Sequence, residues 1–131
     1  MISKHIRNPD ATAEKHRRII KLVEYILNPE TENATEKCVY HCARGFITGE
    51  RSMQLNEMIA LSEDATRSKN TVEHFMLSWR EGEKPTPEQI EELITIWLAE
   101  MGLNGCQAVY GLHEDTDNYH LHIAVNRMHP E

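Results

Sequence analysis

The C-terminal stretch, residues 113–131, contains the pattern that most restricts how this chain folds. From residue 120 the side chains alternate in two sets, with His120, His122, Ala124 and Asn126 in one and Leu121, Ile123 and Val125 in the other. An alternation of period two is typical of a strand with one face on the core and the other face open. A second apolar run, residues 106–112, precedes it and is separated from it by a short polar segment. The sequence therefore predicts a C-terminal antiparallel hairpin.

The histidines of this hairpin predict a metal site. The alternation directs His120 and His122 to the same face, and pairing of the two strands brings His113 beside His120. Three imidazoles that converge and leave positions for water or substrate make an open catalytic metal site. Asp115, in the predicted turn, is able to orient a ligand histidine. A structural zinc site in an intracellular protein is the alternative interpretation.

Composition limits the class of protein. The chain has 131 residues, 40% of them hydrophobic, which is enough for one domain, residues 1–131, with a core of its own. We see no apolar run of membrane-spanning length and no signal-peptide core. Three cysteines without such a signal indicate free thiols in a reducing compartment. The net charge of −7 argues mildly against nucleic acid, although six Lys and Arg residues lie within residues 4–21.

Hydrophobic periodicity predicts helices that alternate with strands. We expect strands at residues 2–6, 38–47 and 71–79, and helices at residues 13–27, 53–62 and 87–101, followed by the hairpin. Thr86 and Pro87 form a common helix start, with the threonine as N-cap. The expected order is β-α-β-α-β-α-β-β, which predicts an α+β fold with helices packed on a mostly antiparallel sheet.

The hairpin residues also carry a resemblance to a known family. The pattern H-x-D-x-x-N-x-H-x-H-x-x-V-N is filled here by His113, Asp115, Asn118, His120, His122, Val125 and Asn126. It resembles the third motif of conjugative relaxases, the plasmid mobilisation nucleases of the HUH endonuclease superfamily, in their MobA/VirD2-like branch. The order of the expected elements agrees with the relaxase fold. Relaxases are normally larger, so we expect this chain to be an N-terminal fragment or a minimal version.

The resemblance assigns site residues that spacing alone does not. The segment Leu22-Val23-Glu24-Tyr25-Ile26 is similar to the one that carries the nucleophilic tyrosine of the family, which makes Tyr25 the expected nucleophile. From composition alone, Tyr25 is an ordinary amphipathic tyrosine with its ring at the edge of the core. Residues 64–70 resemble the second motif of the family, so we expect its polar residues to contact DNA phosphates. The expected DNA-binding residues are Arg67, Ser68 and Lys69.

The resemblance implies a function and its partners. The expected activity is site- and strand-specific nicking of single-stranded DNA at a plasmid transfer origin, through a 5′-phosphotyrosyl link. A divalent metal, Mg or Mn or another transition metal, is expected on His113, His120 and His122, with Asp115 as general base or as the group that orients a histidine. Expected partners are accessory relaxosome proteins and a coupling protein in the bacterial cytoplasm. The alternatives are a non-catalytic DNA-binding module and a structural metal module.

Overall fold

A five-stranded antiparallel sheet forms the centre of the molecule. The computed structural model describes residues 2–6, 15–32, 34–64, 71–115 and 118–130, and the side chain of residue 2 is outside this description. The strands lie in the order β1-β3-β5-β4-β2, and each neighbouring pair is antiparallel. Their bounds are Ile2–Ile6 for β1, Glu36–Arg44 for β2, Val72–Ser78 for β3, Ala108–Asp115 for β4 and Asn118–Asn126 for β5. The C-terminal strand β5 is therefore the central strand of the sheet.

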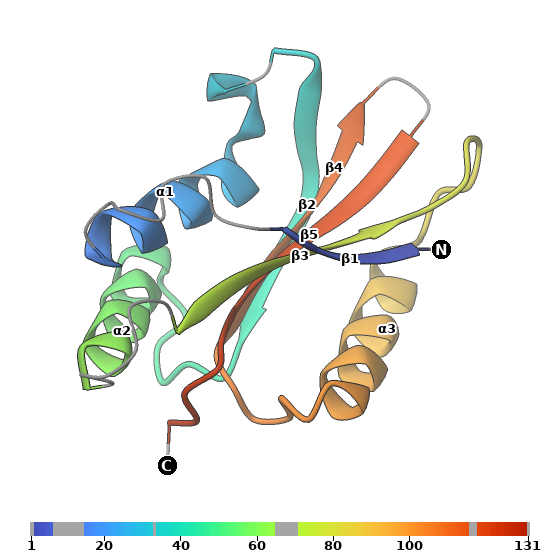
Figure 1. The fold of residues 1–131 in the computed structure, drawn as a ribbon. Coiled ribbons are helices and arrows are strands. Elements are labelled where there is room, and N and C mark those ends of the chain that lie inside the picture. Colours follow the sequence, from blue (N-terminus) through green and yellow to red (C-terminus); the bar gives the residue numbers. More distant parts are fainter. Residues whose placement is uncertain (1, 7–14, 33, 65–70, 116–117, 131) are drawn as a thin grey trace.

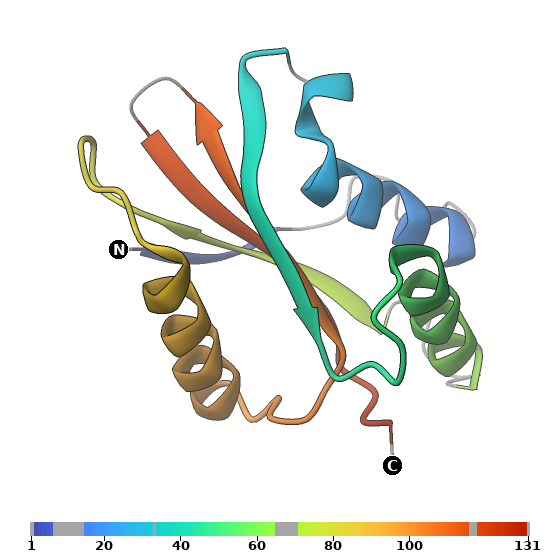
Figure 2. The ribbon, with the colours of Figure 1, turned by 180° about the vertical axis from the view of Figure 1, so that it is seen from behind.

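Helices cover both faces of this sheet. The helices α1 (Lys15–Leu27) and α2 (Arg51–Asp64) pack on one face, and α3 (Pro87–Glu100) packs on the other (Figures 1 and 2). A short 3-10 helix, η1 (Pro29–Thr31), follows α1. The observed order of elements confirms the predicted one, and the α+β architecture with a mostly antiparallel sheet is confirmed as well. No helix of the described ranges is long and apolar enough to cross a membrane.

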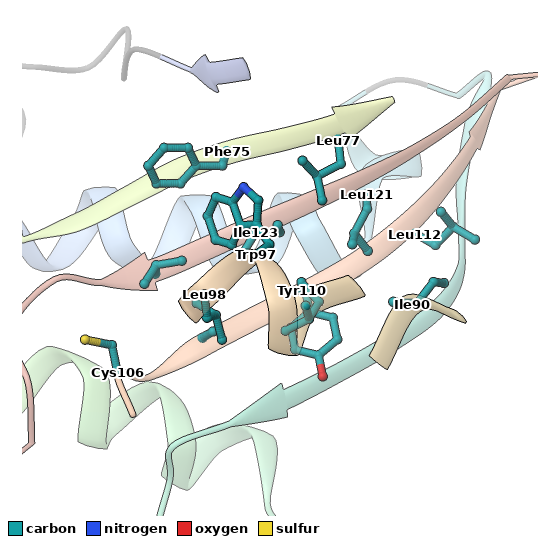
Figure 3. Packing of buried hydrophobic residues seen from close by; sticks show 13 residues of the cluster. Phe75, Leu77, Ile90, Trp97, Leu98, Cys106, Tyr110, Leu112, Leu121 and Ile123 are labelled. Carbon is teal, nitrogen blue, oxygen red and sulfur yellow. The ribbon is translucent and has the colours of Figure 1, made fainter. Parts of the chain in front are cut away.

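The alternation of β5 divides its side chains between two cores. Leu121, Ile123 and Val125 are fully buried against α3, together with residues of that helix (Figure 3). Ala124 lies in the second core, which the sheet forms with α1 and α2. Since His122 has the same parity as Ala124, its imidazole faces α1. The strand pattern predicted that the histidine face of the sheet is open to solvent. This prediction was wrong, because α1 covers that face.

The hairpin has the predicted register. His113 of β4 and His120 of β5 are directly opposite each other, as are Asp115 and Asn118 at the end next to the turn. Residues 116 and 117 of the turn lie outside the described part of the chain.

The start of α3 also agrees with prediction. The Thr86 hydroxyl accepts a hydrogen bond from the Gln89 backbone N–H at 3.2 Å, and the Gln89 side chain accepts one from the Thr86 N–H at 2.8 Å. This reciprocal capping box, with Pro87 in the first turn, satisfies backbone donors that the helix itself leaves unpaired.

One strand boundary differs from the sequence prediction in a way that affects the site. We expected the second strand to begin at residue 38, but β2 begins at Glu36. The two additional residues pair with the end of β4, Glu36 opposite Asp115 and Lys37 opposite Glu114. Long-range pairing with β4 therefore extends the strand by two charged residues, and it brings Glu36 to the histidine face.

Candidate active site

The ring of Tyr25 lies across a group of imidazoles on the sheet. Its centroid is 5.3 Å from that of His113 and 5.3 Å from that of His122, with interplanar angles of 80° and 87°. The ring of His74, from β3, is 6.1 Å away at 68°. Tyr25 reaches this position because its neighbours Val23 and Ile26 are buried and fix that face of α1 on the sheet. The predicted nucleophile and two of the three predicted metal ligands therefore lie together.

The hydroxyl of Tyr25 has an acidic partner. It donates a hydrogen bond to Oε2 of Glu36 at 3.1 Å. Burial and the negative charge of Glu36 raise the pKa of Tyr25 to about 12, so the phenol is protonated near neutral pH. Glu36 was not among the predicted site residues, because it precedes the expected start of the second strand and nothing local indicated that its carboxylate would face the tyrosine.

The imidazole of His113 is held in one orientation. It is fully buried, and its Nε2 lies 2.7 Å from the carbonyl oxygen of Ile26. Because a carbonyl oxygen only accepts hydrogen bonds, Nε2 carries the proton of the neutral ring and Nδ1 carries a lone pair. That Nδ1 atom lies 3.6 Å from Oε2 of Glu36 and has no hydrogen-bond partner within the described structure. Burial lowers the pKa of His113, which favours the neutral ring.

His122 and His74 form a pair. Nδ1 of His122 lies 2.8 Å from Nε2 of His74, and the ring centroids of His122 and His113 are 4.3 Å apart. Burial lowers the pKa of His122 to about 2 and that of His74 to about 4, so both rings are neutral near pH 7. His74 was not among the predicted metal ligands. The alternation of the predicted strand indicates the face to which His74 points. Only the pairing of β3 with β5 brings its imidazole beside His122.

His120 has a different environment from the other two predicted ligands. Its Nδ1 lies 3.0 Å from the Ser78 hydroxyl oxygen of β3, directly opposite in the sheet. The structure thus brings His113 and His122 into contact and keeps His120 one pleat away, beside His113 across the hairpin. Among the described residues, no three or more His, Cys, Asp or Glu side chains are already arranged to hold a metal ion.

Two nitrogen atoms at the site nevertheless fit a divalent metal. Nδ1 of His113 and Nε2 of His122 are both buried and lack a hydrogen-bond partner in the described part of the chain. A buried polar atom without a partner costs about 1–3 kcal/mol. Imidazole nitrogens with free lone pairs are good ligands for transition metals, and a bound cation removes this cost. These two nitrogen atoms are therefore of the kind that the predicted metal would need, although the described residues do not form a complete set of ligands.

The remaining predicted site residues are placed as follows. Asp115 ends β4, opposite both Glu36 and Asn118, and its parity places it on the histidine face one pleat beyond His113. The predicted DNA-binding residues Arg67, Ser68 and Lys69 lie outside the described residues.

Two other tyrosines belong to the opposite face of the sheet, as expected for structural residues. The hydroxyls of Tyr40 and Tyr110 donate to the carboxylate of Glu91 in α3, at 2.6 Å and 2.5 Å, and Arg44 binds the same carboxylate at 2.9 Å. Burial is the main cause that raises the pKa of both tyrosines. The network anchors α3 to the sheet and leaves Tyr25 as the tyrosine that faces the histidines.

A tyrosine on a helix therefore lies over histidines of the sheet, and two buried nitrogen atoms of these histidines have no hydrogen-bond partner in the described part of the chain. Comparison with known proteins places the chain in a family of nucleases. The model of the relaxase family, MobA/VirD2-like, nuclease domain, matches residues 25–131, from Tyr25 to the end of the chain. This protein belongs to that relaxase family, as its motifs predicted.

Individual relatives agree with this assignment. A protein MobA from Acidithiobacillus ferrooxidans is 62% identical over 74 residues, which cover 56% of this chain and 18% of the relative. A protein TraI from Escherichia coli is 32% identical over 133 residues, covering 99% of this chain and 17% of the relative. The chain therefore spans less than a fifth of the length of these curated relatives. No solved structure matches the chain significantly.

Proposed function

We propose that this protein is a site- and strand-specific nickase and transesterase that acts on single-stranded DNA at a plasmid transfer origin, in the bacterial cytoplasm. The proposal depends chiefly on one observation, the contact of the Tyr25 ring with His113 and His122 on the central strands. Membership of the relaxase family supports it. The proposed partners are accessory relaxosome proteins and a coupling protein.

In the proposed reaction Tyr25 attacks the scissile phosphorus in line. The O–H bond of Tyr25 breaks, a bond forms between its Oη and phosphorus, and the bond from phosphorus to the 3′ oxygen breaks. The DNA then has a free 3′ hydroxyl, and its 5′ phosphate is linked to the tyrosine. Since one phosphate ester replaces another, attack by a 3′ hydroxyl on this link rejoins the strand.

The histidines would serve this reaction by holding a divalent metal (Mg, Mn or another transition metal), which would polarise the phosphate. His113 and His122 offer the free Nδ1 and Nε2 atoms, and His120 is the third proposed donor beside His113. We assign Asp115 to the orientation of a ligand histidine, since the Tyr25 hydroxyl contacts Glu36 instead. Arg67, Ser68 and Lys69 are proposed to bind DNA phosphates.

A denaturing-gel assay tests the proposed function. The wild type, Tyr25→Phe and Tyr40→Phe are incubated with Mn or Mg and a panel of 3′-labelled single-stranded oligonucleotides that contain plasmid transfer origins. We expect a labelled protein–DNA adduct for the wild type, none for Tyr25→Phe, and none after addition of a chelator. Tyr40→Phe is the matched control, because its hydroxyl lies on the opposite face of the sheet, and it is expected to keep the adduct.

The other outcomes separate the alternatives. Cleavage by Tyr25→Phe would assign the attack to another tyrosine or to metal-bound water. Tight oligonucleotide binding without cleavage would indicate a non-catalytic DNA-binding module. Unfolding on chelation, with no binding of DNA, would indicate a structural metal module.

A further inference from the structure

Glu36 occupies a position that neither the motifs nor the comparisons assign. It is the first residue of β2, and the register with β4 places it opposite Asp115 on the histidine face. Its side chain is 13% exposed, and its Oε2 atom accepts the hydrogen bond of the Tyr25 hydroxyl at 3.1 Å. The same oxygen lies 3.6 Å from Nδ1 of His113. Glu36 therefore contacts the proposed attacking atom and faces a proposed metal ligand.

The attack of Tyr25 requires an acceptor for its proton. A phenol is a weak nucleophile until it loses that proton, and its ordinary pKa is about 10. An acceptor within hydrogen-bond distance is the first requirement for general base catalysis. The carboxylate of Glu36 meets this requirement in the structure as it stands.

The neighbouring imidazoles have other contacts. Nε2 of His113 donates to the carbonyl oxygen of Ile26, and Nδ1 of His122 is bonded to His74. Their remaining nitrogen atoms are the ones that fit a metal ion. In this arrangement the imidazoles would hold the cation, and the carboxylate of Glu36 contacts the tyrosine.

We infer that Glu36 is a further catalytic residue, which holds the Tyr25 hydroxyl in place and accepts its proton as the bond to phosphorus forms. The inference rests on the proposed function of Tyr25. The proton moves from Oη of Tyr25 to Oε2 of Glu36, the electron pair left on Oη forms the bond to phosphorus, and the 3′ oxygen leaves with the pair of the broken bond. The 3′ oxygen then takes a proton from water, and Glu36 returns its proton to solvent, which regenerates the carboxylate.

Four proteins test this role: the wild type, Glu36→Gln, Glu36→Asp and the matched control Glu32→Gln. The last one changes an exposed carboxylate just after η1. The substrate is a 3′-labelled oligonucleotide that the wild type cleaves. For each variant we measure the single-turnover rate of adduct formation, the affinity for this oligonucleotide, and the thermal unfolding. We expect Glu36→Gln to slow adduct formation by about 10²–10⁴-fold, the range typical of a lost general base, with an oligonucleotide affinity close to that of the wild type. Glu36→Asp should restore part of the rate, and Glu32→Gln should match the wild type.

A fluorinated tyrosine at position 25 separates proton transfer from a purely structural role. A more acidic phenol depends less on a base. Trifluorotyrosine at this position is therefore expected to reduce the defect of Glu36→Gln. A defect of the same size with both phenols would overturn proton acceptance by Glu36, and so would a normal rate for Glu36→Gln.

The design also distinguishes this inference from the proposed function. If the wild type forms an adduct and Tyr25→Phe does not, a normal Glu36→Gln overturns only the role of Glu36. If the wild type forms no adduct with any oligonucleotide, the proposed function fails, and the role of Glu36 fails with it. If Glu36→Gln does not fold, Glu36→Asp decides the matter. That variant keeps the carboxylate but moves it away from the tyrosine, so a rate equal to that of the wild type would contradict the inference.

Discussion

Gly111 controls how closely the tyrosine helix approaches the histidines. It lies on β4, one pleat from His113, on the face covered by α1. A Cβ atom added at this position would be 2.7 Å from the carbonyl oxygen of Ile26 and 3.2 Å from Sγ of Cys38. The Ile26 carbonyl is also the group to which His113 donates its hydrogen bond, and Ile26 directly follows Tyr25. A single methyl group at Gly111 would therefore disturb both parts of the site.

The contact distances indicate the size of the effect of Gly111→Ala. Ordinary contacts begin at 3.4 Å, so the Ile26 backbone must move by about 0.7 Å to accept the new methyl group. Overpacking of this kind costs about 1–3 kcal/mol, and the lower entropy of the unfolded chain returns about 0.4–1 kcal/mol. We expect a net loss of about 1–2 kcal/mol in the free energy of unfolding. A displacement of about 1 Å at a reacting group costs about 10²-fold in rate, so adduct formation should slow by roughly 10–100-fold.

Denaturant unfolding and the adduct assay together check this prediction. Gly49→Ala is the matched control, because an added Cβ there meets nothing within 4 Å. The control should stay within about 0.5 kcal/mol of the wild type, in line with surface substitutions in general. If Gly111→Ala were as stable as Gly49→Ala, the close approach of α1 to β4 would be refuted. A lower stability with an unchanged rate would instead refute the link between this approach and the position of Tyr25.

Three further predictions concern the same face of the sheet. His74→Asn should weaken Mn²⁺ binding by about 10–100-fold in calorimetric titration, because His122 loses the partner of its Nδ1 atom. Equal weakening in the exposed control His41→Asn would contradict this role of His74. In chelator-treated protein, the free energy of unfolding should fall as the pH drops from 6.5 toward 4, by up to about 1.4 kcal/mol per pH unit for each histidine of that pair. Burial lowers their folded pKa values to about 4 and about 2, so only the unfolded chain takes up protons in this range, and a flat profile would refute the argument. Asn126→Ala should lower the free energy of unfolding, measured in urea, by about 1–3 kcal/mol. The buried Asn126 side chain forms hydrogen bonds with a backbone carbonyl of α2, a glutamine side chain and a backbone N–H. A loss no larger than that of the exposed control Asn104→Ala would contradict this prediction.

Much of the fold was predictable because local patterns carry the information. The alternation from residue 120 identified β5, its two faces and the pairing of His113 with His120. Helical spacing and the Thr86 cap identified the three helices in their correct order. A motif resemblance added Tyr25, whose residue type and spacing alone are those of an ordinary tyrosine at the edge of a core. These features depend on residues that are close together in the sequence or that belong to one hairpin.

The other part of the site depends on which strands are neighbours, and this is a property of the folded chain. Period two shows the face to which a side chain points on its own strand, but it does not show which strand lies beside it. The order β1-β3-β5-β4-β2 brings His74 to His122 and Ser78 to His120, and the pairing of β2 with β4 carries Glu36 to the Tyr25 hydroxyl. The sequence by itself determined the fold class and the hairpin that carries His113, His120 and His122, and its motif resemblance singled out Tyr25 as the proposed nucleophile. Only the tertiary structure decided which groups hold the tyrosine and the imidazoles, because those groups come from strands that are distant in the chain.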